Sequence, residues 1–287
     1  NAVGTPDKPI VMTSEKEEPG AWGGIHICGR AHTNAEGGKG SSEIGGAVYG
    51  GNDDADNSGT LQYIRLEYTG FAFDEEHEAN GISFYSVGNG TIVDHCQAYK
   101  GSDDGFEFFG GSVNVSNLVA VSCSDDSFDW TEGWNGKGTN LVAYQEAEST
   151  LGYDCDCLME CDNNGSNNAA TPVAHPVLKN LILVGNGGSK QGIRLRAGTE
   201  VEIDNAKVCG KGQPLTVETA LTENALKNGT SKLTNITLTS ELSSKEGIYT
   251  HADFIAVTSN KVDANLSYSS FEDIRKECSW MNGSWVK

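Results

Sequence analysis

The sequence predicts an all-β fold, a right-handed parallel β-helix whose coils stack into a solenoid and end in an irregular C-terminal capping segment. Two kinds of short apolar segment alternate along residues 1–200, each bounded by Gly, Asn, Asp or Ser. Helical periodicity is weak in that region. The second kind recurs at spacings of 24, 22, 31 and 34 residues, starting at Gly81, Gly105, Ser127, Leu158 and Gly192.

One coil is too short to bury its own apolar face, so it gains a core only by stacking on its neighbours. Coils of 22 and 24 residues match one turn of a three-sided β-helix, and the longer coils require loops, for example between residues 162 and 176. A β-propeller needs about four strands in every ~40–50 residues, and these coils are too short for that. We therefore expect a β-helix over residues 1–210. Residues 211–287 should add further coils and a cap, with short helices near 217–227 and 271–278 that cover the end of the solenoid.

Composition narrows the functional classes. The 36 glycines and 6 prolines indicate many tight turns. Forty acidic residues against 20 basic ones give a net charge of −20, which repels nucleic acid and favours divalent cations, or basic and neutral molecules, as partners. Solubility in a salty or extracellular medium is the alternative explanation of this charge. No apolar run approaches the ~20 residues that a membrane-spanning helix needs.

The cysteine count suggests an oxidising, extracellular compartment. Eight cysteines form an even set that suits disulfides, and Cys209 and Cys278 could tie the C-terminal segment to the last coils. Buried apolar stacking is the alternative, and a metal cluster at Cys155, Cys157 and Cys161 has no nearby His to complete it. Seven Asn-x-Ser/Thr sites could carry glycans. The disulfide candidates are Cys28, Cys96, Cys123, Cys155, Cys157, Cys161, Cys209 and Cys278.

Several motifs together resemble those of a family of large secreted bacterial cell-surface proteins. They are the run from Gly4 to Thr13, Trp22-Gly-Gly-Ile25, Asp56-Asn-Ser-Gly-Thr-Leu61, Asp103-Asp-Gly-Phe-Glu-Phe-Phe-Gly110 and Asp125-Asp-Ser-Phe-Asp-Trp130. The resemblance implies a parallel β-helix, export and surface attachment, and no settled enzymatic activity. It also implies that further coils precede Gly4, so that this chain begins part-way along a longer solenoid.

Stacking the second segment series in register brings acidic residues together. Side chains alternate between the two faces of a strand. Ile82, Phe106, Phe128, Met159 and Ile193 should then share one inward column, and Phe84, Phe108, Trp130, Cys161 and Leu195 another. Between them, the outward column reads Ser83, Glu107, Asp129, Glu160 and Arg194. A second column, upstream, reads Asp103, Asp125, Asp156 and Lys190, with Asp104 and Asp126 beside it.

Carboxylates stacked in this way repel one another. At the ~4.8 Å between neighbouring strands, two of them repel by roughly 3 kcal/mol at an effective dielectric constant of ~20. Raised pKa values, a basic residue at the end of the column or bound cations would relieve the repulsion. We therefore predict that Glu107, Asp129 and Glu160 bind a ligand, with Ca²⁺ as the expected cofactor. For Asp103 and Asp125 we expect a role in turn formation, by hydrogen bonds to backbone amides, in preference to a ligand or catalytic role.

Two smaller features also suggest binding. Asp54, Asp56 and Ser58 have the spacing of a calcium loop, although Arg65 stands where an EF-hand needs its bidentate Glu, and a surface turn is the alternative. Trp134 lies in a Gly-rich turn after the acidic segment and is predicted to be an exposed contact for sugars.

These observations predict an extracellular, structural or adhesive solenoid with an acidic, calcium-binding face. Its expected partners are polysaccharides, other surface proteins or further copies of itself. The alternative is a lyase or glycoside hydrolase for acidic polysaccharides. In that enzyme, acid and base would come from Asp103, Asp104, Asp125 and Asp126, and Arg194 and Lys190 would bind uronate.

Overall fold

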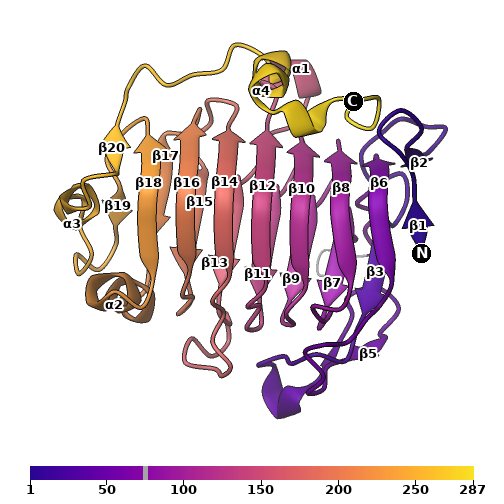
Figure 1. The fold of residues 1–287 in the computed structure, drawn as a ribbon, viewed down its shortest axis with the longest axis horizontal. Helices are drawn as coiled ribbons and strands as arrows, with labels where there is room; N and C mark the ends of the chain where they lie inside the picture. Colours follow the sequence, from indigo (N-terminus) through magenta and orange to yellow (C-terminus); the bar gives the residue numbers. More distant parts are fainter. Residues whose placement is uncertain (74–76) are drawn as a thin grey trace.

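Two parallel sheets, built coil upon coil, run the length of the molecule on either side of its core (Figure 1). This computed structural model describes residues 1–73 and 77–287. One sheet has ten strands and the other has eight, and every pairing within them is parallel between equivalent segments of successive coils. The predicted parallel β-helix is confirmed.

The strands of the ten-stranded sheet are β1 (Ala2–Val3), β2 (Ile10–Met12), β6 (Thr60–Glu67), β8 (Ile92–Tyr99), β10 (Asn114–Val121), β12 (Lys137–Tyr144), β14 (Val177–Val184), β16 (Glu202–Cys209), β18 (Lys232–Leu238) and β20 (Lys261–Val262). Those of the eight-stranded sheet are β3 (Ile25–Cys28), β7 (Ile82–Tyr85), β9 (Phe106–Phe109), β11 (Phe128–Thr131), β13 (Met159–Asp162), β15 (Gln191–Arg196), β17 (Gln213–Val217) and β19 (Ser243–Ser244). A small antiparallel pair, β4 (Gly40–Ser41) and β5 (Val48–Tyr49), stands apart from both sheets.

Most strands of the ten-stranded sheet bend at one residue with a positive φ angle. In β10 and β12 these residues are Asn117 (φ 56°) and Asn140 (φ 59°), and the pairing register skips both. Asn tolerates the left-handed conformation better than most residues. Because Val115 and Leu118 are both buried on either side of the bend, the coil turns within the strand, in line with a three-sided coil.

The bend residues also bond to one another along the solenoid axis. Asn140 Nδ2 donates to Asn117 Oδ1 at 2.8 Å, and Asn180 Nδ2 donates to Asn140 Oδ1 at 3.0 Å. Asn205 Nδ2 continues the series to Asn180 Oδ1 at 2.8 Å. We call these four residues the asparagine ladder.

Aromatic side chains stack along the core beneath the eight-stranded sheet. The ring centroids of Phe84 and Phe108 lie 5.0 Å apart, and those of Phe106 and Phe128 lie 5.5 Å apart. Trp134 continues the first stack at 4.1 Å from Phe108 and is only 1% exposed. Trp134 is therefore not the predicted exposed sugar contact, because its turn folds the indole inward, where Nε1 donates to the Val113 carbonyl oxygen.

All eight cysteines are free thiols, so the described part of the chain contains no disulfide and that prediction is corrected. The physical reason is that most of these thiols act as apolar core atoms. Cys161, for example, pairs in register with Trp130 and Leu195 inside the core. Cys209 and Cys278 share an apolar cluster outside the ten-stranded sheet but are not bonded to each other.

Both predicted C-terminal helices form, but only the first covers the end of the solenoid. α2 (Ala220–Asn228) and α3 (His251–Ala256) lie at the end where β18 to β20 finish (Figure 1), and Leu226 and Phe254 extend the core there. The other helices are α1 (Glu148–Leu151), α4 (Phe271–Glu277) and two 3₁₀ turns, η1 (Glu36–Gly38) and η2 (Ser279–Met281). None of the described helices has the length and apolar character that crossing a bilayer requires.

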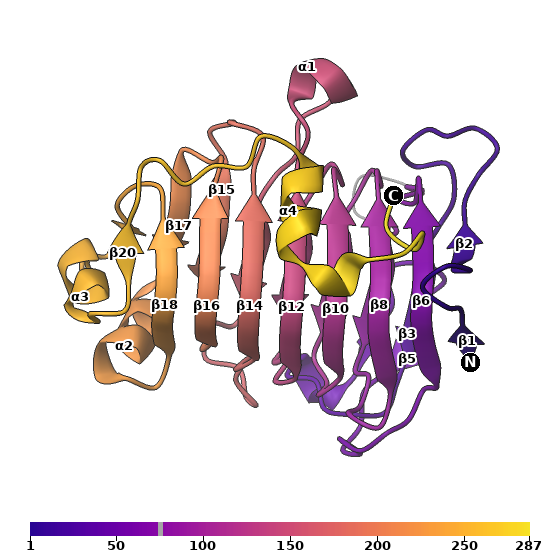
Figure 2. The same cartoon turned by 45° about the horizontal axis from the view of Figure 1, so that its top comes forward.

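The second predicted capping helix, α4, lies instead across the outer face of the ten-stranded sheet, in front of β10 and β12 (Figure 2). We call residues 263–287 the C-terminal strap. Its residues Trp285 and Val286 pack with outward-facing Val119 and Val142. The strap reaches the first coil, where the Ser284 amide donates to the Pro6 carbonyl oxygen at 2.8 Å. Its helix is therefore not an end cap, because apolar outward residues on the sheet hold it there.

Candidate functional site

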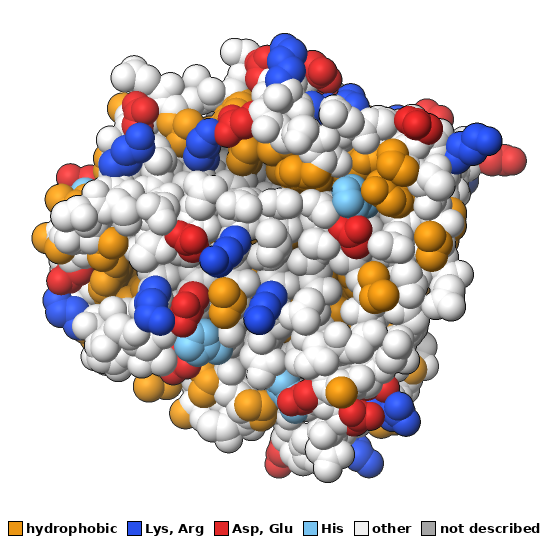
Figure 3. Space-filling view, viewed as in Figure 1, with side chains coloured by type: hydrophobic (Ala, Val, Ile, Leu, Met, Phe, Trp, Pro, Cys, Tyr) orange, Lys and Arg blue, Asp and Glu red, His pale blue; other side chains and the backbone are white. Residues whose placement is uncertain are grey.

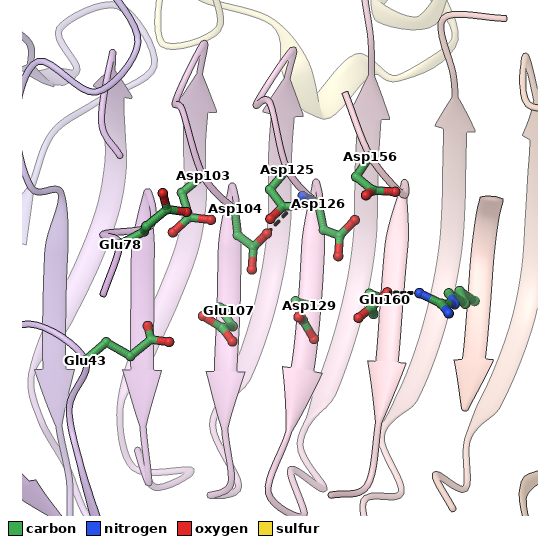
Figure 4. A pocket seen from close by; sticks show the side chains of 11 residues that line it. Glu43, Glu78, Asp103, Asp104, Glu107, Asp125, Asp126, Asp129, Asp156 and Glu160 are labelled. Atoms are coloured by element: carbon green, nitrogen blue, oxygen red, sulfur yellow. Dashed lines mark hydrogen bonds and ion pairs between the residues drawn. The ribbon is translucent and has the colours of Figure 1, made fainter. Parts of the chain in front are cut away.

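A groove of about 420 Å³ opens on the outer face of the eight-stranded sheet, and ten of the eleven side chains that line it are acidic (Figure 4). We call it the acidic groove. Its lining residues are Glu43, Glu78, Asp103, Asp104, Glu107, Asp125, Asp126, Asp129, Asp156, Glu160 and Arg194. All six acidic residues that the sequence predicted at positions 103, 104, 107, 125, 126 and 129 lie in it, together with Glu160.

The floor of the acidic groove is the predicted outward column. Ser83 pairs with Glu107, Glu107 with Asp129, Asp129 with Glu160, and Glu160 with Arg194. These side chains point outward because the alternate residues of each strand fill the core. Because the strands pair in parallel register, Glu107, Asp129 and Glu160 are direct neighbours from one strand to the next.

The turns before the strands form one wall of the groove, and here the backbone bonds differ from the prediction. Asp104 Oδ1 accepts the Asp126 amide at 2.9 Å, and Asp126 Oδ1 accepts the Cys157 amide at 2.6 Å. Asp104 and Asp126 therefore form the hydrogen bonds to backbone amides that we expected of their neighbours Asp103 and Asp125. Figure 4 shows the carboxyl groups of Asp103 and Asp125 on the groove side of these turns.

Basic residues close both acidic columns at the same end. Arg194 Nη1 donates to Glu160 Oε2 at 2.9 Å, and its Nε donates to Glu218 Oε1 at 3.2 Å. Lys190 Nζ lies 2.8 Å from Asp156 Oδ2. Arg196, which was not among the predicted site residues, pairs with both Glu160 and Asp162. These ion pairs therefore lie at one end of the groove, in the coils of β13 and β15.

Among the described residues, no basic side chain forms an ion pair with the carboxyl groups in the middle of the groove, and the pKa values of these carboxyl groups are strongly perturbed. Burial, followed by repulsion from Asp125, raises the pKa of Asp103 to about 7. Burial, followed by repulsion from Asp156, raises the pKa of Asp125 to about 6. For Glu107 and Asp129, burial and the neighbouring carboxylates hold the pKa well above its usual range. At neutral pH the groove therefore holds protons or attracts cations.

Four groups of side chains have the spacing to hold a metal ion, with their ligand atoms within 4.8 Å of one another. The groups are Asp103, Asp104 and Asp125; Asp104, Glu107 and Asp129; Asp126, Asp129 and Glu160; and Asp126, Asp156 and Cys157. The first three consist of carboxylates alone, and each shares a residue with the next. In the fourth, burial raises the pKa of the Cys157 thiol, so a thiolate ligand is disfavoured there.

Two buried oxygens beside these groups lack a hydrogen-bond partner among the described residues, namely Asn80 Oδ1 and Asp129 Oδ1. Asn80 is only 1% exposed, and its Nδ2 donates to Glu107 Oε2 at 2.5 Å. Leaving a polar atom buried without a partner costs about 1–3 kcal/mol. Oxygen atoms left in this state next to carboxylates fit a hard cation.

Glu43, Glu78 and Asn80 also lie at the site, although the coil repeat did not predict them there. Glu43 comes from the segment between β4 and β5, and Glu78 comes from the loop before β7. Neither belongs to the coil repeat, so the sequence offered no signal for them. Asn80, however, precedes Gly81 as Asp104 precedes Gly105, and aligning the coils could have identified it.

The second predicted calcium site, at Asp54, Asp56 and Ser58, is used for contacts within the protein. Asp54 Oδ1 accepts the His32 amide at 3.1 Å and lies 2.7 Å from His32 Nδ1. Asp56 Oδ1 lies 2.9 Å from the Arg30 guanidinium, and Ser58 Oγ donates to Asp56 Oδ2 at 3.0 Å. These contacts stabilise a surface loop. None of the three residues belongs to the four groups of described residues that could hold a metal ion.

Comparison with known proteins relates the whole chain to one family. A family model described as a pectate-lyase-like beta helix domain matches residues 1–286. Neither the curated proteins nor the solved structures include a match to this chain.

Proposed function

The chain belongs to the pectate-lyase-like β-helix family, and we propose that it binds divalent cations, Ca²⁺ first, in the acidic groove and holds an acidic polysaccharide through them. The observation that carries this proposal is the run of three carboxylate groups that share Asp104 and Asp129, beside the unpartnered oxygens of Asn80 and Asp129. Ca²⁺ takes six to eight oxygen ligands in flexible geometry, which suits ligands from separate coils.

The ligand class follows from charge. Without cations, the groove repels polyanions, and its pocket-lining side chains offer a neutral chain little but carboxylates. Bound Ca²⁺ would neutralise part of this charge and offer coordination positions to the carboxylates of a uronate-containing chain. Lys190, whose side chain is 48% exposed, stands at the end of the groove where such a chain would leave it.

We propose binding, in an extracellular or cell-surface setting, in preference to catalysis. A lyase needs a base that is free to abstract a proton from the sugar. Arg194 and Arg196 are both held by two carboxylates, and Lys190 is paired with Asp156. A stiff solenoid that presents a cation-bridged polysaccharide site fits an adhesive or structural role.

Hydrolysis is the second candidate, and one observation favours it. Asp103 and Asp125 have ligand atoms within 4.8 Å of each other and pKa values raised to about 7 and about 6. Retaining glycosidases use two carboxyl groups ~5–5.5 Å apart, one protonated and one ionised. If the pair is catalytic, Asp125→Asn abolishes the formation of new reducing ends. If the groove only binds, no reducing ends form with any acidic polysaccharide.

The binding proposal is tested by measuring attachment of the protein to immobilised polygalacturonate and alginate, with dextran as the neutral control. We expect attachment in CaCl₂ and release by EDTA. Glu107→Gln should weaken it, whereas Glu202→Gln, on the outer face of the opposite sheet, should leave it unchanged. Attachment that is equal in CaCl₂ and EDTA would contradict the proposal.

A further inference from the structure

A second cavity, of about 210 Å³, lies on the opposite side of the molecule from the acidic groove, between the C-terminal strap and the outer face of the ten-stranded sheet. Figure 3 looks onto this side, where hydrophobic side chains gather along the base of the segment that carries α4. We call this cavity the strap pocket. The side chains that matter for its chemistry are Asn140, Asn180, Asn205, Lys207, Glu277 and Trp280.

We infer that the strap pocket binds one neutral sugar unit of a glycan. The first argument is the hydrogen-bonding capacity of the asparagine ladder. Asn140, Asn180 and Asn205 each donate one N–H to the asparagine of the preceding coil, which leaves each amide a second N–H. Asn205 Oδ1 accepts no hydrogen bond from the described residues. The ladder thus presents fixed donors and one acceptor at the ~4.8 Å spacing of the strands.

The second argument is the aromatic wall opposite these amides. Trp280 is partly exposed in η2, and one side of its ring packs near Trp285 and His95, at centroid distances of 6.2 Å and 6.5 Å. An indole face carries partial negative charge, so it attracts the weakly positive C–H groups on one face of a sugar ring. A held ring also loses little conformational freedom on binding.

The third argument is charge and size. Lys207 and Glu277 form an ion pair at the pocket, so its formal charge is zero and a neutral ligand is favoured over an ion. The volume of about 210 Å³ equals that of roughly seven water molecules. It is smaller than the ~300–1,000 Å³ of pockets for drug-sized ligands. One sugar ring fits these limits, whereas a peptide helix or a long chain does not.

This site is independent of the acidic groove, because no acidic residue of the groove lines it. It would give the protein a cation-independent contact with a glycan on its other side. The Lys207–Glu277 pair supplies a donor and an acceptor for sugar hydroxyl groups.

The test is saturation-transfer NMR in EDTA, with the methyl glycosides of glucose, galactose and mannose and with N-acetylglucosamine as the probes. We expect at least one probe to bind in the millimolar range. Asn205→Gly should weaken that binding about tenfold, which corresponds to the loss of one or two hydrogen bonds. Trp280→Ala should abolish it, and Trp280→Phe should retain part of it.

The matched control is Asn235→Gly. Asn235 has the same left-handed conformation (φ 57°) as Asn205 (φ 64°), occupies the next coil and does not line the strap pocket. Binding in this variant should equal that of the wild type. Thermal melting of all the variants checks that the strap stays in place, and Asn205→Gly decides the outcome if Trp280→Ala loosens it. The inference is overturned if no probe shows saturation transfer, or if Asn205→Gly binds as well as Asn235→Gly.

Discussion

Each of the two outer faces of this solenoid carries a column of polar side chains at equivalent positions of successive coils. In one column neighbouring side chains form hydrogen bonds with one another, and in the other they repel one another. In the asparagine ladder, Asn140, Asn180 and Asn205 each donate to the asparagine of the preceding coil at 2.8–3.0 Å, because an amide has both donors and an acceptor. In the acidic groove, Glu107, Asp129 and Glu160 occupy equivalent positions of successive strands. A carboxylate is an acceptor only, so these residues repel one another.

The difference separates a column that is stable without a ligand from one that is not. The amides of the ladder bond to one another and stabilise the bend of each coil, and their remaining N–H groups stay available to a neutral ligand. The groove destabilises the fold unless protons or cations enter it, which is the expected property of a site kept for binding.

Stability should depend on pH in the opposite sense to that of most acidic proteins. The pKa of Asp103 is about 7 in the folded protein and ~3.9 in an unfolded chain. Between these values the folded state binds more protons than the unfolded state, so the free energy of unfolding falls as pH rises. In EDTA we expect Asp103 to lower the free energy of unfolding by about 2–3 kcal/mol between pH 5 and 7. Urea unfolding at each pH measures this change. Asp125, which is more exposed, should add a smaller loss.

The control for this experiment is the same titration in Asp103→Asn, which should have a flatter profile. Adding CaCl₂ to the wild type should flatten the profile as well, because cations replace protons. A free energy of unfolding that rises between pH 5 and 7 in EDTA would contradict the unsatisfied state of the groove.

The basic end of the groove should matter more than other ion pairs. Arg194→Met leaves Glu160 and Glu218 without its guanidinium, and we expect a loss of about 2 kcal/mol, below the ~3–5 kcal/mol of fully buried pairs because the site is partly exposed. Lys232→Met, which breaks an exposed pair with Glu202, should cost under about 1 kcal/mol. Chemical denaturation measures both variants. If they lose the same free energy of unfolding, the ion pairs of Arg194 are no stronger than an exposed surface pair.

Exchanging amide and carboxylate between the two columns should have effects of opposite sign. In EDTA at neutral pH, Asp129→Asn removes repulsion and should raise the free energy of unfolding by about 1 kcal/mol. Asn140→Asp removes the donor to Asn117 and should lower it by a similar amount, about 1 kcal/mol. Both substitutions are nearly isosteric, so effects of the same sign would remove the contrast between the columns.

The smallest effect is expected at Asp54. Asp54→Asn should leave Ca²⁺ affinity unchanged and cost under about 1 kcal/mol, because the carboxylate pairs with His32 at the surface. A clear loss of Ca²⁺ affinity in this variant would restore the calcium loop that the sequence suggested.

The sequence was sufficient for those parts of the site that follow the coil repeat. The positions of Glu107, Asp129, Glu160 and Arg194 follow from the alternation of side chains and the register between coils, and each was predicted correctly. The same is true of the aromatic stacks in the core.

Features outside the repeat were missed or misread for physical reasons. Glu43 and Glu78 reach the groove from loops whose paths depend on tertiary contacts. Trp134 follows a Gly-rich turn that looks exposed in sequence, but the indole closes the core stack on Phe108. The strap was mistaken for an end cap because the outward valines that hold it, such as Val119, stand in strands that already have an apolar inner face.

Calorimetric titration of the metal-free protein with CaCl₂ near pH 7, in buffers of different ionisation heat, tests the cation site most directly. We expect binding with proton release, since cations displace protons from carboxyl groups with raised pKa values. Asp129→Asn should weaken binding at least about tenfold by removing a shared ligand, whereas Asp204→Asn on the opposite face should bind like the wild type. No binding, or equal binding in all three proteins, would contradict the assignment of the acidic groove as a cation site.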